Sequence, residues 1–310
     1  MPGSPPLAWG TPFRLSLGWR DLGLVVVLSV IWGISTPISK IGVNELPPLF
    51  MLAVRFFIVA AAAFFYPVSG AQMRQLLRLS LTLAVLHFPC MFIGLRYIDA
   101  SAAAVLTQLQ LPFAVLLAGF VFGERLSARA LAGIALAFVG VVVIAGTPNI
   151  FAAGWTGLVL MVAAAFFWAI ASLQMKSLGR ISPFAANAWL AVFAAPVLLI
   201  ESWIFEQSPL SSLSGLTVTG AGAILYLVVM TTFVGYGIWF KLVQAHPVSV
   251  VMPFTLTNPM FGILSSALML GEQITLQFML GAALTLCGLA LIVVAPAKLV
   301  QSADGSERTA

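Results

Sequence analysis

Charge is scarce in this chain of 310 residues, because Asp, Glu, Lys and Arg together make up only 7% of it. Soluble domains usually carry charge on about a quarter of their residues, so the composition excludes an ordinary soluble globular protein. Cysteine and histidine are equally sparse, with two of each. Cys90 and Cys287 both fall inside long apolar runs, which argues against a disulfide framework and a metal site. We therefore expect no metal and no cofactor.

Apolar runs of the length that an α-helix needs to cross a hydrocarbon core, about 20 residues, recur along the whole chain. They predict an all-α integral membrane protein in a lipid bilayer. The ten transmembrane helices are expected at residues 21–40, 47–67, 76–97, 100–122, 128–147, 155–176, 183–205, 219–241, 247–270 and 275–296. The first run resembles the apolar part of a signal peptide, but no small-residue cleavage site follows it, so we expect a retained helix.

The basic residues are distributed unevenly between the two sides of the predicted bundle. With the N-terminus in the cytoplasm, eleven of the fourteen Lys and Arg residues lie on that side, and only Lys40 and Arg96 lie outside. Positive residues hold short loops in the cytoplasm during insertion. We therefore expect cytoplasmic tails at 1–20 and 297–310. The excess of basic residues behind the net charge of +5 is thus explained by the orientation of the chain in the membrane. No nucleic-acid partner is expected.

An internal repeat appears when residues 18–40 are compared with residues 154–176. At a constant offset of 136 the two segments share several residues, including Trp32 with Trp168. Later in each half the offset becomes 148, and the fourth and fifth spans match the ninth and tenth. At the offset of 136, Lys40 also matches Lys176. At the offset of 148 the matched pairs include Glu124 with Glu272, Gly133 with Gly281 and Gly140 with Gly288.

The repeat predicts two five-helix units, at residues 21–147 and 154–296. Since five is odd, the second unit lies in the membrane upside down relative to the first. Inverted repeats are typical of secondary transporters, which hold substrate near the midplane between two halves that move alternately. The pattern therefore favours alternating access over an enzyme or a structural anchor.

Short motifs in both halves resemble those of a known family. A Trp-Gly pair (Trp32-Gly33), an Arg in the second span (MLAVRF, Arg55) and a Gly-Glu turn (FGERL, repeated as LGEQI) resemble the EamA branch of the drug/metabolite transporter superfamily. The resemblance implies a ten-helix metabolite exporter of the bacterial inner membrane, with amino acids prominent among its small-molecule substrates. Within that family the chain is similar to the YddG-type aromatic amino acid exporters. We expect it to function as a monomer.

A polar face runs along the first predicted span. Trp32, Ser35 and Thr36 are spaced to lie on one side of a helix, and Trp168 and Ser172 take corresponding places in the sixth span. We expect these residues to line a cavity; the alternative is that the small residues only allow close helix packing. A proline at position 37 removes a backbone donor and is expected to kink the helix.

Amides beside prolines mark the fourth and ninth spans. The pairs coincide at the offset of 148: Thr107 with Thr255, and Gln110 with Asn258, next to Pro112 and Pro259. Amides near the midplane suit the ammonium and carboxylate of a zwitterionic amino acid. Interhelical hydrogen bonding, worth only about 0.6 kcal/mol on average, is the alternative.

Three more side chains stand out inside predicted spans. His87 is a substrate-cavity candidate that titrates near neutral pH, or else a hydrogen-bonded packing residue. Tyr236 is a candidate aromatic wall, or part of an interfacial belt. Arg55 is too deep to reach the surface, so we expect a carbonyl or acidic partner for it. We expect Arg55, Glu124 and Glu272 to have structural roles.

The means of energy coupling is left open by the sequence. Every Asp and Glu lies near a span end or in a tail, and a proton relay usually needs a carboxylate within the span. The expectation is facilitated diffusion or weakly coupled antiport through His87. A multidrug or other-metabolite exporter of the same fold is the nearest alternative. A channel or scramblase would need charge rings or a carbonyl filter, and an intramembrane enzyme would need a catalytic motif; neither is visible, so we expect no enzyme.

Overall fold

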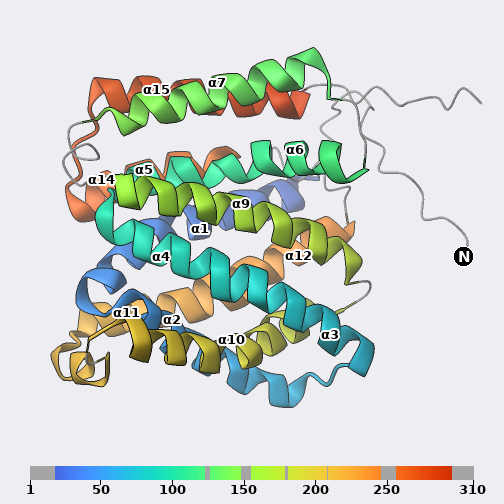
Figure 1. Ribbon diagram of the computed structural model, residues 1–310, viewed down its shortest axis with the longest axis vertical. Coiled ribbons are helices and arrows are strands. Elements are labelled where there is room, and N and C mark those ends of the chain that lie inside the picture. Colours follow the sequence, from blue (N-terminus) through green and yellow to red (C-terminus); the bar gives the residue numbers. More distant parts are fainter. Residues whose placement is uncertain are drawn as a thin grey trace, which may run out of the picture.

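The computed structural model describes residues 18–122, 126–147, 155–178, 181–207, 209–245 and 256–294. This part of the chain is helical throughout, and no strand occurs in it. Its helices run back and forth as a bundle of long, roughly antiparallel rods (Figure 1). The expected all-α class is therefore confirmed.

The bounds of the elements are as follows. The first part of the chain forms α1 (Trp19–Glu45), α2 (Pro48–Ala60), η1 (Ala61–Phe65), α3 (Gly70–Leu79), η2 (Ser80–His87), α4 (Phe88–Tyr97), α5 (Ala100–Leu106), η3 (Thr107–Leu109), α6 (Gln110–Phe122) and α7 (Ala128–Ala145). The second part forms α9 (Trp155–Ser177), α10 (Pro183–Phe205), η4 (Pro209–Gly215), α11 (Val218–Tyr226), η5 (Leu227–Gly235), α12 (Tyr236–Ala245), α14 (Asn258–Leu270) and α15 (Leu276–Val294). Of the η elements, η2 and η5 are π-helical and the others are 3-10 helices.

Nine helical stretches of the described chain are long and apolar enough to cross a membrane. Several combine short elements; one stretch, Gly70–Tyr97, is built from α3, η2 and α4. The ninth predicted span, 247–270, is represented by α14 alone, and residues 246–255 lie outside the described part. Large apolar side chains cover the outside of the bundle, for example Phe64 and Phe120, each 89% exposed. Such a surface suits a hydrocarbon solvent.

Local sequence sets where the helices begin and end. Proline occupies the first turn of α2 and α10. Backbone N–H groups there have no partner within the helix, so the lack of one in proline costs no hydrogen bond. Ser127 precedes α7 and its hydroxyl accepts a hydrogen bond from the N–H of Ala130, which caps the helix. Gly271, with φ of 67°, ends α14 in the left-handed conformation that glycine adopts without strain.

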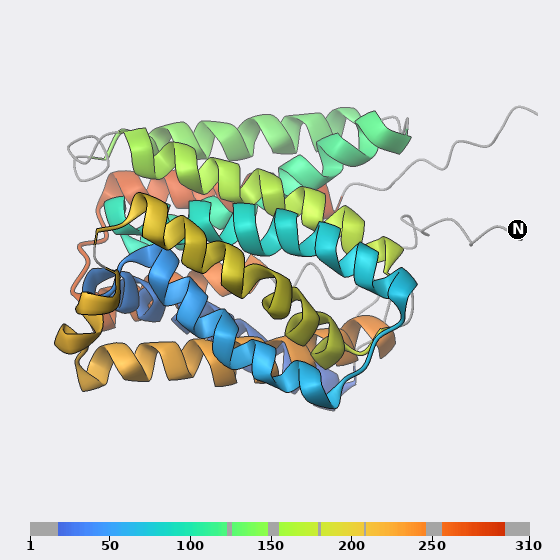
Figure 2. The ribbon, with the colours of Figure 1, turned by 60° about the horizontal axis from the view of Figure 1, so that its bottom comes forward.

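The helices pack in pairs that are far apart in sequence. Both views place α7 along α15 at one edge of the bundle and α2 beside α10 (Figures 1 and 2). The α7–α15 crossing depends on glycine: a Cβ at Gly133 or Gly140 would lie within 2.6 Å of a backbone oxygen of α15. The facing residues are Gly288 and Gly281. The repeated glycines therefore form a seam where two backbones approach closely, as small residues allow in membranes.

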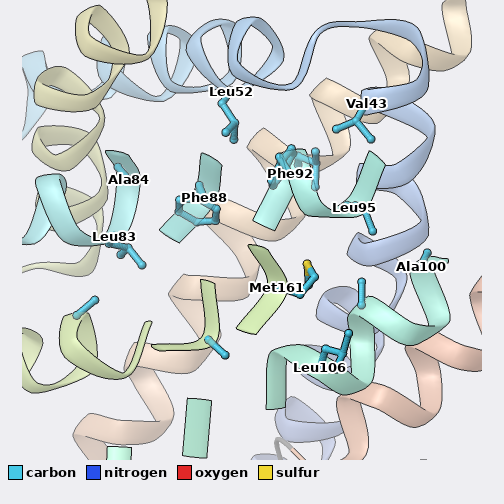
Figure 3. Packing of buried hydrophobic residues seen from close by; sticks show 14 of the residues in the cluster. Val43, Leu52, Leu83, Ala84, Phe88, Phe92, Leu95, Ala100, Leu106 and Met161 are labelled. Atoms are coloured by element: carbon cyan, nitrogen blue, oxygen red, sulfur yellow. The ribbon is translucent and has the colours of Figure 1, made fainter. Parts of the chain in front are cut away.

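The core between the pairs is filled by apolar side chains. Figure 3 shows Leu52 of α2, Phe88 and Phe92 of α4, and Met161 of α9 converging on one buried cluster. Side chains from α1 and α5 complete it. This packing holds α4 against α9 and places His87, at the end of η2, at the centre of the bundle.

Candidate functional site

An aromatic group links α1 to α12. The Trp32 ring lies 5.6 Å from the Tyr236 ring in an edge-on arrangement and 5.7 Å from the Trp239 ring, measured between centroids. A Cβ at Gly235 would be only 2.6 Å from Trp32 Nε1. The indole therefore fills the space left by the missing side chain of Gly235.

A second aromatic group links α9 to η2. The rings of Trp168 and His87 are 5.0 Å apart, and the His87 ring is 4.9 Å from that of Phe88. His87 is buried, and its Nδ1 lies 2.8 Å from the carbonyl oxygen of Ala164. That contact requires the proton on Nδ1, which fixes the tautomer of the neutral ring.

The two groups correspond to each other in the repeat. Trp32 and Trp168 are 136 positions apart, and each contacts the end of a π-helical segment, η5 or η2. Gly235 stands 148 positions after His87, and Tyr236 stands 148 positions after Phe88. π-Helical turns are rare and frequently occur at functional sites. The contribution of Gly235 and Phe88 was missed by the sequence reasoning, because the third and eighth spans share no conspicuous residues.

Arg55 lies between these groups. Its side chain is 3% exposed, and its guanidinium carbon is 5.3 Å from the centroid of Phe88. A terminal nitrogen donates to the hydroxyl of Thr232 at 3.1 Å, and that hydroxyl in turn donates to the carbonyl of Leu227. The phenol of Tyr236 lies near the guanidinium as well. The sequence predicted a carbonyl or acidic partner, whereas the hydrogen-bond partner among the described residues is Thr232 of η5, which no sequence pattern indicated.

The hydroxyls of the polar faces are largely engaged by their own helices. Ser35 donates to the carbonyl of Trp32 at 2.6 Å, and Ser172 donates to that of Trp168 at 2.8 Å. Thr107 donates to Ala104 in the same way. In this structure these three groups are satisfied locally, which agrees with the packing alternative as well as with a cavity wall.

The α1 helix continues unbroken through Pro37, and both Pro37 and Thr36 are buried. A Cβ at Gly33 would be 3.0 Å from the carbonyl oxygen of Asn258, so α14 begins directly against α1. Among the described residues, no group donates a hydrogen bond to the buried side-chain oxygen of Asn258.

The fourth span is interrupted where the sequence places its polar pair. The 3-10 turn η3 separates α5 from α6, which begins at Gln110 and includes the buried Pro112. The α14 helix begins 148 positions later, at Asn258, with Pro259 in its first turn. Within the described part of the chain, no hydrogen bond joins Gln110 to Asn258. Thr255 and Glu124 lie outside the described part of the chain.

Glu272 and Lys40 converge on the turn between α4 and α5. The Glu272 carboxylate accepts from the N–H groups of Ala100 and Ser101 at 2.6 and 2.9 Å. Lys40 donates to the carbonyls of Leu95 and Ile98 at 2.6 and 2.9 Å. Each charge thus meets the helix terminus of opposite polarity, and Glu272 ties the loop between α14 and α15 to the start of α5.

A bundle of long apolar helices with an apolar outer surface is that of a multi-pass membrane protein. The chain belongs to the EamA-like transporter family, whose sequence profile matches residues 20–146 and again residues 155–294.

Several characterised and uncharacterised proteins are similar to this chain. A probable amino-acid metabolite efflux pump of Escherichia coli is 35% identical over 280 residues, covering 87% of this chain and 93% of that protein. The Salmonella typhimurium protein of the same description is 34% identical, with the same coverage. The uncharacterized transporter YoaV of Bacillus subtilis is 26% identical, covering 86% and 94%. A crystal structure with 17% identity and a TM-score of 0.61 covers 90% of this chain and 99% of that one, which shows a shared fold.

Proposed function

We propose that the protein is a secondary transporter of the bacterial inner membrane that exports amino acids and related small metabolites by alternating access. Two similar proteins described as probable amino-acid metabolite efflux pumps support the export of amino acids. We further propose that both termini are cytoplasmic, that the monomer is the functional unit, and that residues 21–147 and 154–296 act as inverted halves.

The observation that carries this proposal is the pair of matched aromatic contacts. Trp32 of α1 contacts Gly235 and Tyr236 of the other half, while Trp168 of α9 contacts His87 of the first half. A cavity that forms between the halves would be walled by these rings in either orientation. The other proposed substrate contacts are Ser35, Thr36, Thr107, Gln110, Ser172, Thr255 and Asn258, with Pro37, Pro112 and Pro259 shaping the helices that carry them.

Aromatic walls favour substrates with an apolar side chain, which includes aromatic amino acids and the larger aliphatic ones. The unpartnered Oδ1 of Asn258 offers an acceptor for a substrate ammonium. For energy coupling we propose facilitated diffusion, or weak antiport through His87. Its Nδ1 donates to the carbonyl of Ala164, so a proton would be exchanged at Nε2.

Counterflow in proteoliposomes tests the transport class. Purified protein is reconstituted with an unlabelled amino acid inside, and uptake of the same labelled amino acid is followed across a panel of aromatic and aliphatic substrates. We expect trans-stimulated uptake with unchanged substrate. A channel would show no trans-stimulation, and an enzyme would return a modified compound. Repeating the assay with and without a pH gradient separates facilitated diffusion from antiport.

Two substitutions test the proposed site. Trp32→Ala removes the ring that contacts Tyr236, and Asn258→Leu removes the unpartnered acceptor. Both variants should reach the membrane in normal amounts and transport more slowly than the parent protein. Unchanged efflux kinetics in both would remove these residues from the site.

A further inference from the structure

Arg55 carries a positive charge that the described part of the chain does not neutralise. Arginine stays protonated in proteins, and a buried ion without a counter-ion is costly. Among the residues that the structure describes, its one hydrogen-bond partner is the neutral Thr232, and its Nε is buried with none. No carboxylate of the described residues forms an ion pair with it, and the nearby titratable side chains are those of Tyr236 and His87.

The rings around the guanidinium compensate only in part. Its central carbon lies 5.3 Å from the Phe88 centroid and 5.7 Å from that of Phe56. Such cation–π contacts contribute about 2 kcal/mol when desolvated, less than several kcal/mol that burial of an ion costs. These contacts therefore offset the cost of burying the charge only in part, and Nε keeps no partner among the described residues.

The surroundings of Arg55 identify the kind of anion. Its helix, α2, belongs to the first half, while Thr232 and Tyr236 belong to the second, so a ligand here would touch both halves. The aromatic groups on either side offer apolar walls. A guanidinium binds a carboxylate through two parallel hydrogen bonds, and Nε is one of the donors used in that arrangement.

We propose that Arg55 binds the carboxylate of the transported substrate, which makes the substrates α-amino acids and other apolar monocarboxylates. This inference rests on the proposed transport function and departs from the scaffold role that the sequence motif favours. We assign Arg55 to substrate binding because the described residues provide no counter-ion for it. Since Arg55 is enclosed in this structure, the carboxylate reaches it when the helices around it separate.

The test compares ligands that keep both charged groups of an amino acid, only its carboxylate or only its ammonium. Inhibition of labelled phenylalanine counterflow is measured with unlabelled phenylalanine, with N-acetylphenylalanine, which keeps the carboxylate, and with phenethylamine, which lacks it. The parent protein should prefer the two carboxylates over the amine by about 30-fold or more, as expected for a buried charge pair that loses one partner. Arg55→Gln should abolish this preference, and Arg55→Lys should reduce it. Arg96→Gln removes an exposed positive charge and should leave the preference unchanged.

A folded Arg55→Gln variant that keeps the preference of the parent protein would overturn the inference. Where that variant does not fold, the thermal stability of the parent protein decides. Phenylalanine and N-acetylphenylalanine should raise its unfolding temperature and phenethylamine should not; equal stabilisation by all three would overturn the inference. If the parent protein moves no amino acid at all, the proposed transport function fails, while the same thermal series still tests the carboxylate site.

Discussion

At the scale of single residues, the site depends on one missing side chain as much as on the rings around it. Trp32 and Tyr236 contact each other only because position 235 has no Cβ to occupy the space beside the indole nitrogen. The corresponding position in the first half holds His87, which faces Trp168 instead. The two halves therefore build similar contacts from different residues.

Gly235→Ala tests this dependence. Its Cβ would lie 2.6 Å from Trp32 Nε1, so the indole has to move. We expect transport to slow about tenfold, equivalent to about 1.4 kcal/mol, with normal expression. Gly237→Ala is the matched control, because its Cβ would meet Phe184 at an ordinary 3.5 Å. Equal transport rates in the two variants would show that the position of Trp32 does not matter.

At the scale of helices, the glycine seam fixes the α7–α15 pair. A Cβ at Gly140 would be 2.5 Å from the backbone nitrogen of Thr285 and from the carbonyl oxygen of Gly281. The backbone cannot yield as a flexible side chain does. The two helices must therefore move apart to admit even one methyl group.

Gly140→Ala should accordingly destabilise the protein by about 1–3 kcal/mol, the usual cost of overpacking, and lower its thermal unfolding temperature in detergent. Gly222→Ala provides the comparison, because nothing lies within 4 Å of its Cβ position on α11. That variant should be as stable as the parent protein or slightly more so. A Gly140→Ala protein with undiminished stability would contradict the close crossing.

The sequence predicted helices well and their irregularities poorly. Apolar runs of membrane length are visible directly, and nine of the helical stretches in the described chain match them. The π-helical segments η2 and η5 leave no trace in a 3.6-residue period. The Arg55–Thr232 bond joins residues 177 positions apart, so no local pattern indicates it. Whether the predicted cavity residues bind substrate is a question for the transport experiments.

At the scale of the whole molecule, carboxylates join the two halves at the end of the bundle where α1 ends. Glu206 accepts from the N–H groups of Leu49 and Phe50 at 2.7 and 2.9 Å. Glu272 does the same at the start of α5. In each case a residue of the second half caps a helix of the first. These caps hold this end of the bundle together.

Glu272→Gln should loosen one cap and leave the other intact. A neutral amide keeps only one acceptor for the two N–H groups of Ala100 and Ser101, and it loses the attraction to the helix N-terminus. We expect faster hydrogen–deuterium exchange in peptides that cover Ala100–Leu106. Peptides from the start of α2, capped by Glu206, serve as the internal control. Unchanged exchange at α5 would show that the contact contributes little.

The π-helical segments carry a further geometric consequence. A π-helical turn contains about one residue more than an α-helical turn. The segments η2 and η5 therefore each hold one extra residue within an otherwise α-helical span. If such a segment became α-helical, the extra residue would shift into the helix that follows. The side chains beyond it would then rotate about the helix axis by about 100°. His87, at the end of η2, would then turn away from Trp168 without any helix being broken. In each half, the π-helical segment ends beside the repeated tryptophan, Trp168 or Trp32.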